Sequence, residues 1–261
     1  MTLYADGALS LTVADRIATL TLDRPQSRNA LNQAMWRALP GIVAQAAADP
    51  AIRVLVVRGA NGAFASGADI AEFPVVFADK AAALDYGRLI ETAATALATL
   101  AKPTIALIEG FCIGAGLALA LACDLRICAE GARLGAPPAK LGLMYGLGDT
   151  RRLVNAVGAS VAKDMLFTGA LYPAAEALRV GLVNAMHPAE ALEAALTAKA
   201  SAIASLSAWS MAHNKAVVER ILQGQSSDDQ DTRDWFASAV DGPDFREALA
   251  AFHAKRPPVF P

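Results

Sequence analysis

Short runs of apolar residues, each bounded by turn-forming residues, mark the strands in the first half of the chain. An alternating pattern predicts strands at residues 9–13 and 17–22. Continuous β-branched and apolar runs at residues 54–58, 104–108 and 125–129 are typical of strands that are buried on both faces. The pattern therefore predicts a sheet with a buried centre.

Apolar residues at helical spacing lie between these strands. Leu31, Met35 and Leu39 recur every four residues and predict a helix that Pro25 and Asn29 open. Alanine-rich segments at residues 79–100 and 115–122 predict two further helices. Strands that alternate with helices indicate the α/β class, in which helices cover a sheet.

The pattern changes near residue 188. Downstream it predicts only helices, and the last should stop at Arg256 because Pro257 and Pro258 cannot continue it. We therefore divide the chain into a core, residues 1–187, and a helical C-terminal region, residues 188–261. No low-complexity linker separates the two parts, so we expect them to pack closely.

Composition narrows the class of protein. Hydrophobic residues make up 55% of the 261, charged residues 18%, and the formal net charge is −2. Because the chain has no excess of basic residues, it is not a nucleic-acid binder that works by neutralising phosphates. The uncharged segment at residues 110–123 is shorter than the roughly 20 residues of a membrane-spanning helix. We expect a cytoplasmic protein with reduced, buried cysteines (Cys112, Cys123, Cys128), whose apolar surplus serves subunit interfaces or a ligand pocket.

Several common enzyme signatures do not occur. Gly110, Gly114 and Gly116 do not fit the GxGxxG spacing of a dinucleotide site, and the chain has neither GK[ST] nor GxSxG. Its three histidines are scattered, so no metal site is expected.

Two glycine-bearing loops remain, and each directly follows a predicted buried strand. They are GAFASGADI at residues 62–70 and GFCIGAG at residues 110–116. Small residues let a ligand approach main-chain N–H groups, and two such loops facing one point would form an oxyanion hole. Either loop alone would be read as a tight turn.

These loops and their surroundings resemble the enoyl-CoA hydratase/isomerase (crotonase) superfamily over nearly the whole chain. The similarity begins with DRPQSRNAL at residues 23–31 and continues through both loops, the segment LACDLRICAEGARLG, and later blocks such as TRRL at residues 150–153. The resemblance implies a spiral of ββα units with a helical C-terminal trimerisation region, assembled as a homotrimer or a dimer of trimers. It also implies an acyl-CoA thioester as substrate, with coenzyme A part of the substrate and no separate cofactor.

The family pattern assigns the oxyanion donors to the backbone N–H groups of Ala68 and Ala115. Family members often have glycine where Ala115 stands, but a backbone donor tolerates alanine. The same pattern makes Arg28 and Lys255 candidate partners of the coenzyme A phosphates, or else solvated surface charges. The remaining substrate contacts implied by the resemblance are Ala30, Asp69, Ile70, Ala71, Gly114, Ala118 and Pro138.

The chain departs from the family at the two positions that matter most for hydration. Hydratases of the family use two glutamates, and the matching positions are Ala118 and Pro138. Neither residue can transfer a proton, so hydration by two carboxylates is not expected. The family's isomerases also rely on a carboxylate in this zone, which weakens that reading as well.

Three readings of the function stay open. The first is an acyl-CoA enzyme that stabilises a thioester enolate. The second is a decarboxylase of a malonyl-type CoA thioester, in which Tyr145 orients the substrate or protonates the enolate; a buried loop tyrosine is the simpler reading of that residue. The third is an acyl-CoA-binding homologue without catalytic activity. Among nearby acids, Asp149 is read as a helix N-cap and Asp124 as a partner of neighbouring backbone.

Overall fold

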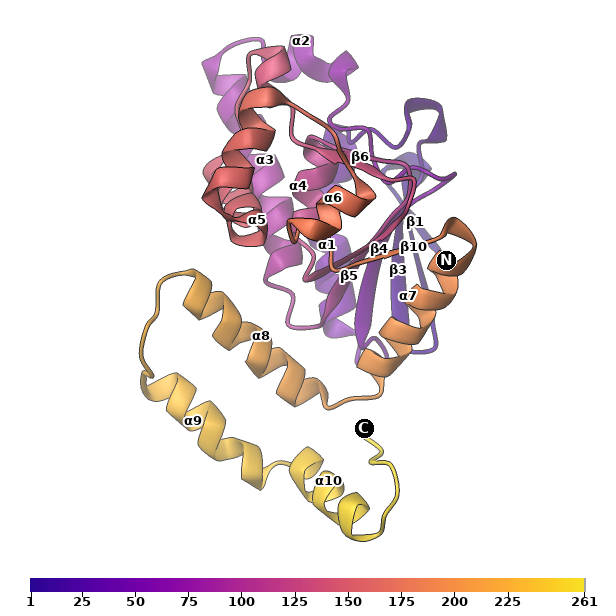
Figure 1. The fold of residues 1–261 in the computed structure, drawn as a ribbon, viewed down its shortest axis with the longest axis vertical. Helices are drawn as coiled ribbons and strands as arrows, with labels where there is room; N and C mark the ends of the chain where they lie inside the picture. Colours follow the sequence, from indigo (N-terminus) through magenta and orange to yellow (C-terminus); the bar gives the residue numbers. More distant parts are fainter. Residues whose placement is uncertain (261) are drawn as a thin grey trace.

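The computed structural model describes residues 1–260 and shows a sheet flanked by helices, from which a helical arm extends (Figure 1). The large sheet has seven strands in the order β1-β2-β3-β4-β5-β7-β10. Strands β1, β2 and β3 pair antiparallel, and the pairs from β3 to β10 are parallel. The strands are β1 (Thr2–Tyr4), β2 (Leu9–Ala14), β3 (Ile17–Leu22), β4 (Val54–Gly59), β5 (Thr104–Ile108), β7 (Leu125–Ala129) and β10 (Ala185–His187).

The centre of this sheet is buried on both faces, as the continuous apolar runs predict. Successive side chains of a strand point to opposite faces. Leu55 and Val57 of β4 pack into the core that is covered by α1 (Gln33–Ala48), α3 (Lys80–Ala98) and α4 (Ala115–Leu121). Val54 and Val56 pack on the other face, against α7 (Ala189–Ala204). The α/β class is confirmed.

A second, three-stranded sheet lies beside the first and has the order β6-β8-β9. Its strands are β6 (Phe111–Ile113), β8 (Arg133–Gly135) and β9 (Tyr172–Pro173). The remaining helices of the core are α2 (Phe73–Val76), α5 (Leu147–Thr168) and α6 (Ala174–Arg179). The strands β6, β8 and β9 are too short to show a periodic pattern, and we did not predict them from the sequence.

One helix start differs from the prediction. Residues 25–27 form a separate 3-10 turn, and α1 begins only after Asn32, whose side chain accepts a hydrogen bond from Met35 N at 2.9 Å. Arg28 and Asn29 adopt left-handed backbone, with φ of 49° and 58°, which a continuous helix cannot contain.

The C-terminal region divides in a way that the sequence does not show. Helix α7 belongs to the core, whereas α8 (Ala208–Leu222), α9 (Gln230–Ser238) and α10 (Pro243–His253) form the arm. No residue of α8 is buried, so the expected close packing is wrong for the arm within one chain. Helix α10 ends at His253, before Arg256, because the chain turns there and Lys255 adopts a φ of 50°.

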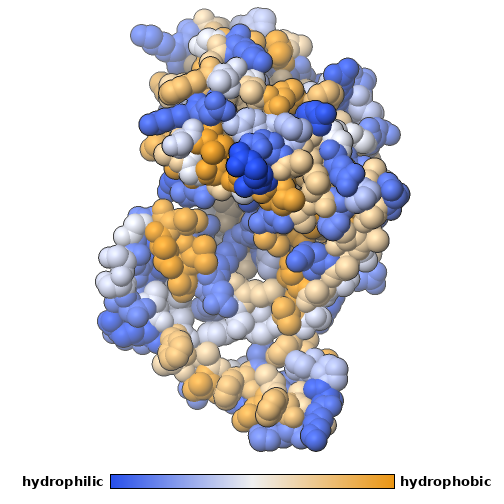
Figure 2. All heavy atoms as spheres, viewed as in Figure 1, coloured by the Kyte–Doolittle hydropathy of each residue, from blue (hydrophilic) through white to orange (hydrophobic). Residues whose placement is uncertain are grey.

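The arm contacts the core through a few polar groups and leaves its apolar side chains exposed. Lys215 Nζ of α8 lies 2.9 Å from Asp124 Oδ2, and Arg53 donates to Leu206 O at 2.8 Å. Apolar side chains gather over α8 and again along α10 (Figure 2). The exposed apolar residues of the arm include Trp209, Val218, Ile221, Leu222, Phe236, Val240, Phe245, Leu249 and Phe252.

None of the helices in residues 1–260 combines the length and apolar character needed to cross a bilayer. The three cysteines are buried free thiols, as expected.

Candidate active site

The two glycine-bearing loops meet at one edge of the large sheet. Strands β4 and β5 are parallel neighbours, so the loops that follow them start side by side. Ala65 N then donates to Phe111 O at 2.9 Å, and Ile113 N donates to Ala65 O at 3.0 Å. These hydrogen bonds form a parallel bridge between Ala65 and Cys112 that holds the first loop against β6.

Glycines make this close approach possible. A Cβ atom on Gly116 would lie 2.7 Å from both Cβ and O of Ala65, so any larger residue must push the loops apart. Gly114 has a φ of 55°, and a Cβ atom on it would lie 3.9 Å from Gly67 Cα. Gly67 and Gly114 directly precede Ala68 and Ala115, so the residues before the two candidate donors lie near each other.

Both candidate N–H groups lack an acceptor among the residues that the structure describes. Leu31 N donates to Gly67 O, and Asp69 N donates to Leu31 O. These bonds form a parallel bridge between Leu31 and Ala68 in which the N–H of Ala68 itself takes no part. Ala115 is the first residue of α4, where amides have no acceptor within the helix. The structure therefore brings the two loops together, while the role of the two N–H groups as oxyanion donors stays a prediction.

A buried asparagine secures the first loop. Asn29 Nδ2 donates to Ala60 O at 2.9 Å and to Ala63 O at 2.7 Å, and its Oδ1 accepts from Arg24 N at 2.9 Å. Asn29 is fully buried, so these hydrogen bonds have no competition from water. The sequence interpretation did not assign this role, although Asn29 lies in the DRPQSRNAL block.

The residues expected along the substrate path lie around this junction, with one exception. Ile70 is 60% exposed at the loop, and the Arg28 guanidinium lies 5.5 Å from the Phe111 ring centroid. Lys255 follows α10, which lies at the opposite end of the molecule from β6 (Figure 1). Within one chain the structure does not bring Lys255 to Arg28.

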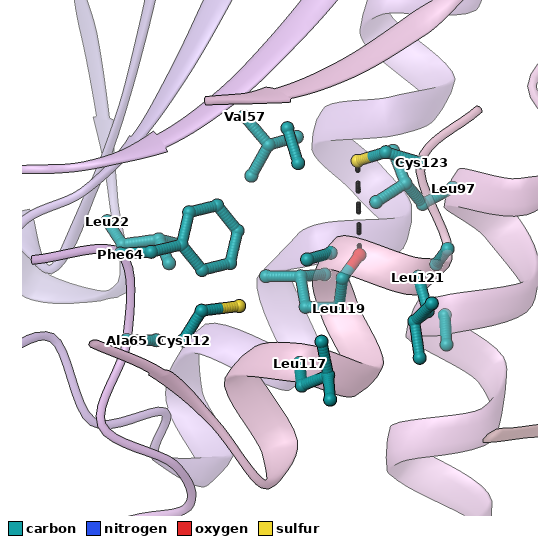
Figure 3. Close-up of a cluster of buried hydrophobic side chains, with 14 of the residues drawn as sticks. Leu22, Val57, Phe64, Ala65, Leu97, Cys112, Leu117, Leu119, Leu121 and Cys123 are labelled. Carbon is teal, nitrogen blue, oxygen red and sulfur yellow. Dashed lines mark hydrogen bonds between the residues drawn. The ribbon is translucent and has the colours of Figure 1, made fainter. Parts of the chain in front are cut away.

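Non-ionisable residues occupy the two positions that the family resemblance gives to glutamates. Ala118 is buried on the first turn of α4, and its N–H donates to Gly114 O at 3.0 Å. Pro138 is half-buried and begins the 3-10 turn Pro138–Leu141. In the core beside α4, Leu117, Cys112 and Phe64 pack together (Figure 3).

The acids that neighbour the first loop have partners. Asp69 Oδ2 lies 2.8 Å from Arg24 Nη2, and Asp69 Oδ1 accepts from Ala71 N at 3.1 Å. Glu72 Oε2 accepts from Gln33 N at 2.8 Å, at the start of α1. Both carboxylates therefore hold the loop and helix in place.

Tyr145 lies where the second loop enters α4. Its hydroxyl donates to Gly114 O at 2.7 Å. Burial raises the pKa of this phenol well above its ordinary value, and the nearby charge of Asp149 raises it further. Tyr145 is therefore a neutral donor whose proton is already bound to backbone.

Asp149 is not the N-cap of α5. The cap is Gly146, without a side-chain hydrogen bond, and Asp149 lies within the first turn. Asp149 Oδ1 accepts from Arg152 Nη1 at 3.0 Å, and Arg152 Nη2 lies 3.5 Å from Glu91 Oε1 on α3. Burial raises the pKa of Asp149, which is the one buried carboxylic acid in residues 1–260. The sequence interpretation read Asp149 as an N-cap, whereas α5 begins at Leu147 and places this residue inside the first turn.

Asp124 is the backbone partner that was expected. Its Oδ2 accepts from Thr104 N at 2.7 Å, and it also accepts from Thr104 Oγ1. Asp124 follows the C-terminal end of α4, away from the donors.

Comparison with known proteins gives one consistent result. The family model described as enoyl-CoA hydratase/isomerase matches residues 12–261. A probable enoyl-CoA hydratase of Rhizobium meliloti is 39% identical over 248 residues, which cover 94% of each chain. The 2,3-dehydroadipyl-CoA hydratase of Escherichia coli is 37% identical over 250 residues, covering 94% of this chain and 95% of that protein.

Solved structures agree with these relatives. The crystal structure of an enoyl-CoA hydratase/isomerase family protein from Hyphomonas neptunium superposes with a TM-score of 0.95 at 40% identity, covering 97% of both chains. The chain therefore belongs to the enoyl-CoA hydratase/isomerase family of acyl-CoA enzymes.

Proposed function

We propose that this enzyme binds an acyl-CoA thioester and stabilises its enolate with the N–H groups of Ala68 and Ala115. The observation that carries the proposal is that these two amides adjoin one close contact between loops and have no acceptor among the described residues. Donors held ready for a developing negative charge lower the energy of an enolate without reorganising during the reaction.

We also propose that the enzyme does not hydrate enoyl thioesters by the two-glutamate route. The relatives named above carry hydratase names, but adding water across a double bond requires groups that take and give protons. In this chain Ala118 and Pro138 stand where the family resemblance places those groups. Asp69 and Glu72 are engaged in holding the first loop and α1.

A proton shift is a second candidate reaction, and Asp149 favours it. Moving a double bond by a 1,3-proton shift needs only one group, which removes a proton from one carbon and returns it to another. Asp149 is a buried carboxyl with a raised pKa, four positions along the chain from the tyrosine that bonds Gly114, and Arg152 Nη1 donates to its Oδ1 at 3.0 Å. Decarboxylation is less well supported, because Tyr145 already donates its proton to Gly114 O.

The exposed apolar residues of the arm support assembly into a homotrimer or a dimer of trimers. Phe236 and Phe252 are 86% and 77% exposed, and α8 has no buried residue. Contiguous exposed apolar surface of this kind marks a protein interface, and further copies of the chain would cover it.

The test uses 4-dimethylaminocinnamoyl-CoA, whose absorption moves to longer wavelength when its carbonyl is polarised. We expect a red shift on binding, little turnover of crotonyl-CoA, and conversion of a 3-enoyl-CoA to the conjugated 2-enoyl-CoA that Asp149→Asn removes. Absence of the red shift contradicts the oxyanion hole. Rapid hydration of crotonyl-CoA contradicts the role given to Ala118 and Pro138. Binding and red shift without any turnover would leave an acyl-CoA-binding homologue.

A further inference from the structure

We propose that Tyr145 is a positioning residue that sets the direction of the Ala115 N–H. The proposal rests on the oxyanion hole described above and gives Tyr145 a role through the backbone in place of contact with the substrate.

The argument starts from one peptide group. The carbonyl of Gly114 and the N–H of Ala115 belong to the same planar unit and point in opposite directions. The Tyr145 hydroxyl donates to Gly114 O at 2.7 Å, an ordinary length for an O–H···O bond. A hydrogen bond that holds this carbonyl therefore also holds the Ala115 N–H on the opposite side, where a thioester oxygen would bind.

This peptide needs an external restraint. Gly114 has φ and ψ of 55° and −120°, a conformation that glycine enters and leaves without steric penalty. Its own N–H donates to Gly135 O at 2.8 Å, which fixes the preceding peptide. Within residues 1–260, the Gly114 carbonyl accepts hydrogen bonds from Ala118 N, at 3.0 Å, and from the Tyr145 hydroxyl, and from no other group. Without the phenol, one helical hydrogen bond would restrain the rotation.

The same bond also strengthens the donor. A hydrogen bond to the oxygen of an amide polarises the group and makes its N–H a better donor. The bond from Tyr145 thus improves the hydrogen bond that Ala115 offers to a developing oxyanion.

The start of α5 keeps the tyrosine in place. Tyr145 directly precedes the N-cap Gly146, and Thr150 N donates to Gly146 O at 3.0 Å. One turn further on, Arg152 lies between Asp149 and Glu91 and ties α5 to α3. The Glu91 carboxylate also lies close to Gly148 at the start of α5.

The experiment compares Tyr145→Phe with Tyr172→Phe, since the Tyr172 hydroxyl donates to Asp164 in an exposed hydrogen bond that involves neither loop. The probe is again 4-dimethylaminocinnamoyl-CoA. Losing one hydrogen bond should weaken binding by about 2- to 10-fold in Tyr145→Phe and should reduce the red shift of the bound probe. Tyr172→Phe should bind and shift the probe as the wild type does.

A second measurement keeps the inference separate from the proposed function. Amide hydrogen exchange of the peptide spanning residues 111–121, without ligand, should be faster in Tyr145→Phe. An unchanged red shift together with unchanged exchange overturns the positioning role, even if the variant melts at a lower temperature. A wild type that produces no red shift contradicts the oxyanion hole, while faster exchange in the variant would still support the restraint on Gly114.

Discussion

Gly116 lies directly against Ala65, and a single Cβ atom at position 116 would overlap the side chain and carbonyl of Ala65. This contact joins the loop that carries Ala68 to the helix that begins at Ala115. In the proposed oxyanion hole the two donors share one ligand, which requires that no side chain separate their backbones.

Replacing Gly116 with valine should therefore disable the site. The larger residue must displace Ala65, which moves the first loop away from α4, and the red shift of the bound chromophoric thioester should be lost. Gly131→Ala is the matched control, since a Cβ atom there meets nothing within 4 Å. An undiminished red shift in Gly116→Val would show that the loops need not be this close.

Asn29→Ala should destabilise the fold around the first loop. The substitution leaves the Ala60 and Ala63 carbonyls without their buried donor. Each unsatisfied buried group costs about 1–3 kcal/mol, measurable by urea unfolding. Asn155→Ala, at an exposed position of α5, should change the unfolding free energy by less than about 0.5 kcal/mol. Equal stability of the two variants would contradict the role of Asn29.

Asn29 and Asp149 show how far the structure could be predicted from the sequence. Runs such as residues 104–108 predict buried strands because a strand that is buried on both faces needs an apolar side chain at nearly every position. The loops were predicted because their glycines follow such strands. Asn29 acts through Ala60, 31 positions away, and Arg152, the partner of Asp149, pairs with Glu91, 61 positions away. No local pattern contains that information, and the same holds for the separation of Lys255 from Arg28.

The arm shows the limit of helical periodicity. The sequence predicted that this region is helical. An apolar stripe on a helix, however, does not indicate whether the core of the same chain covers it. Helix α7 packs on the sheet through Leu192 and Leu196, whereas Phe236 and Phe252 remain exposed. Only the three-dimensional path of the chain distinguishes these helices.

Restoring the missing carboxylates should create hydratase activity. In Ala118→Glu/Pro138→Glu, we expect crotonyl-CoA hydration to rise by about 100-fold or more, because positioned general acids and bases contribute factors of 10² to 10⁴. Loss of the enoyl absorbance measures the rate. Ala118→Glu/Ala139→Glu, with the second carboxylate at an exposed neighbouring position, is the control and should gain less. No gain in a folded double variant would contradict the explanation based on these two positions.

Asp149 should make stability depend on pH in a defined direction. Burial raises its pKa above the ordinary value of 3.8, so the folded protein keeps this proton to higher pH than the unfolded chain does. Its contribution to the free energy of unfolding is therefore complete below pH 3.8 and declines as pH rises through the folded pKa. The difference in stability between the wild type and Asp149→Asn should follow this decline, whereas Asp85→Asn, at an exposed site, should not. A difference that grows with pH would mean that Arg152 outweighs burial.

The most direct test of the oxyanion hole measures the thioester carbonyl itself. Butyryl-CoA labelled with ¹³C at the carbonyl carbon gives an infrared band that isotope editing separates from the protein. We predict that this band moves to lower frequency on binding to the wild type, because two backbone N–H groups draw electron density to the oxygen, and that it moves less in Gly116→Val. A band that stays at its aqueous frequency when the ligand is bound would contradict the account.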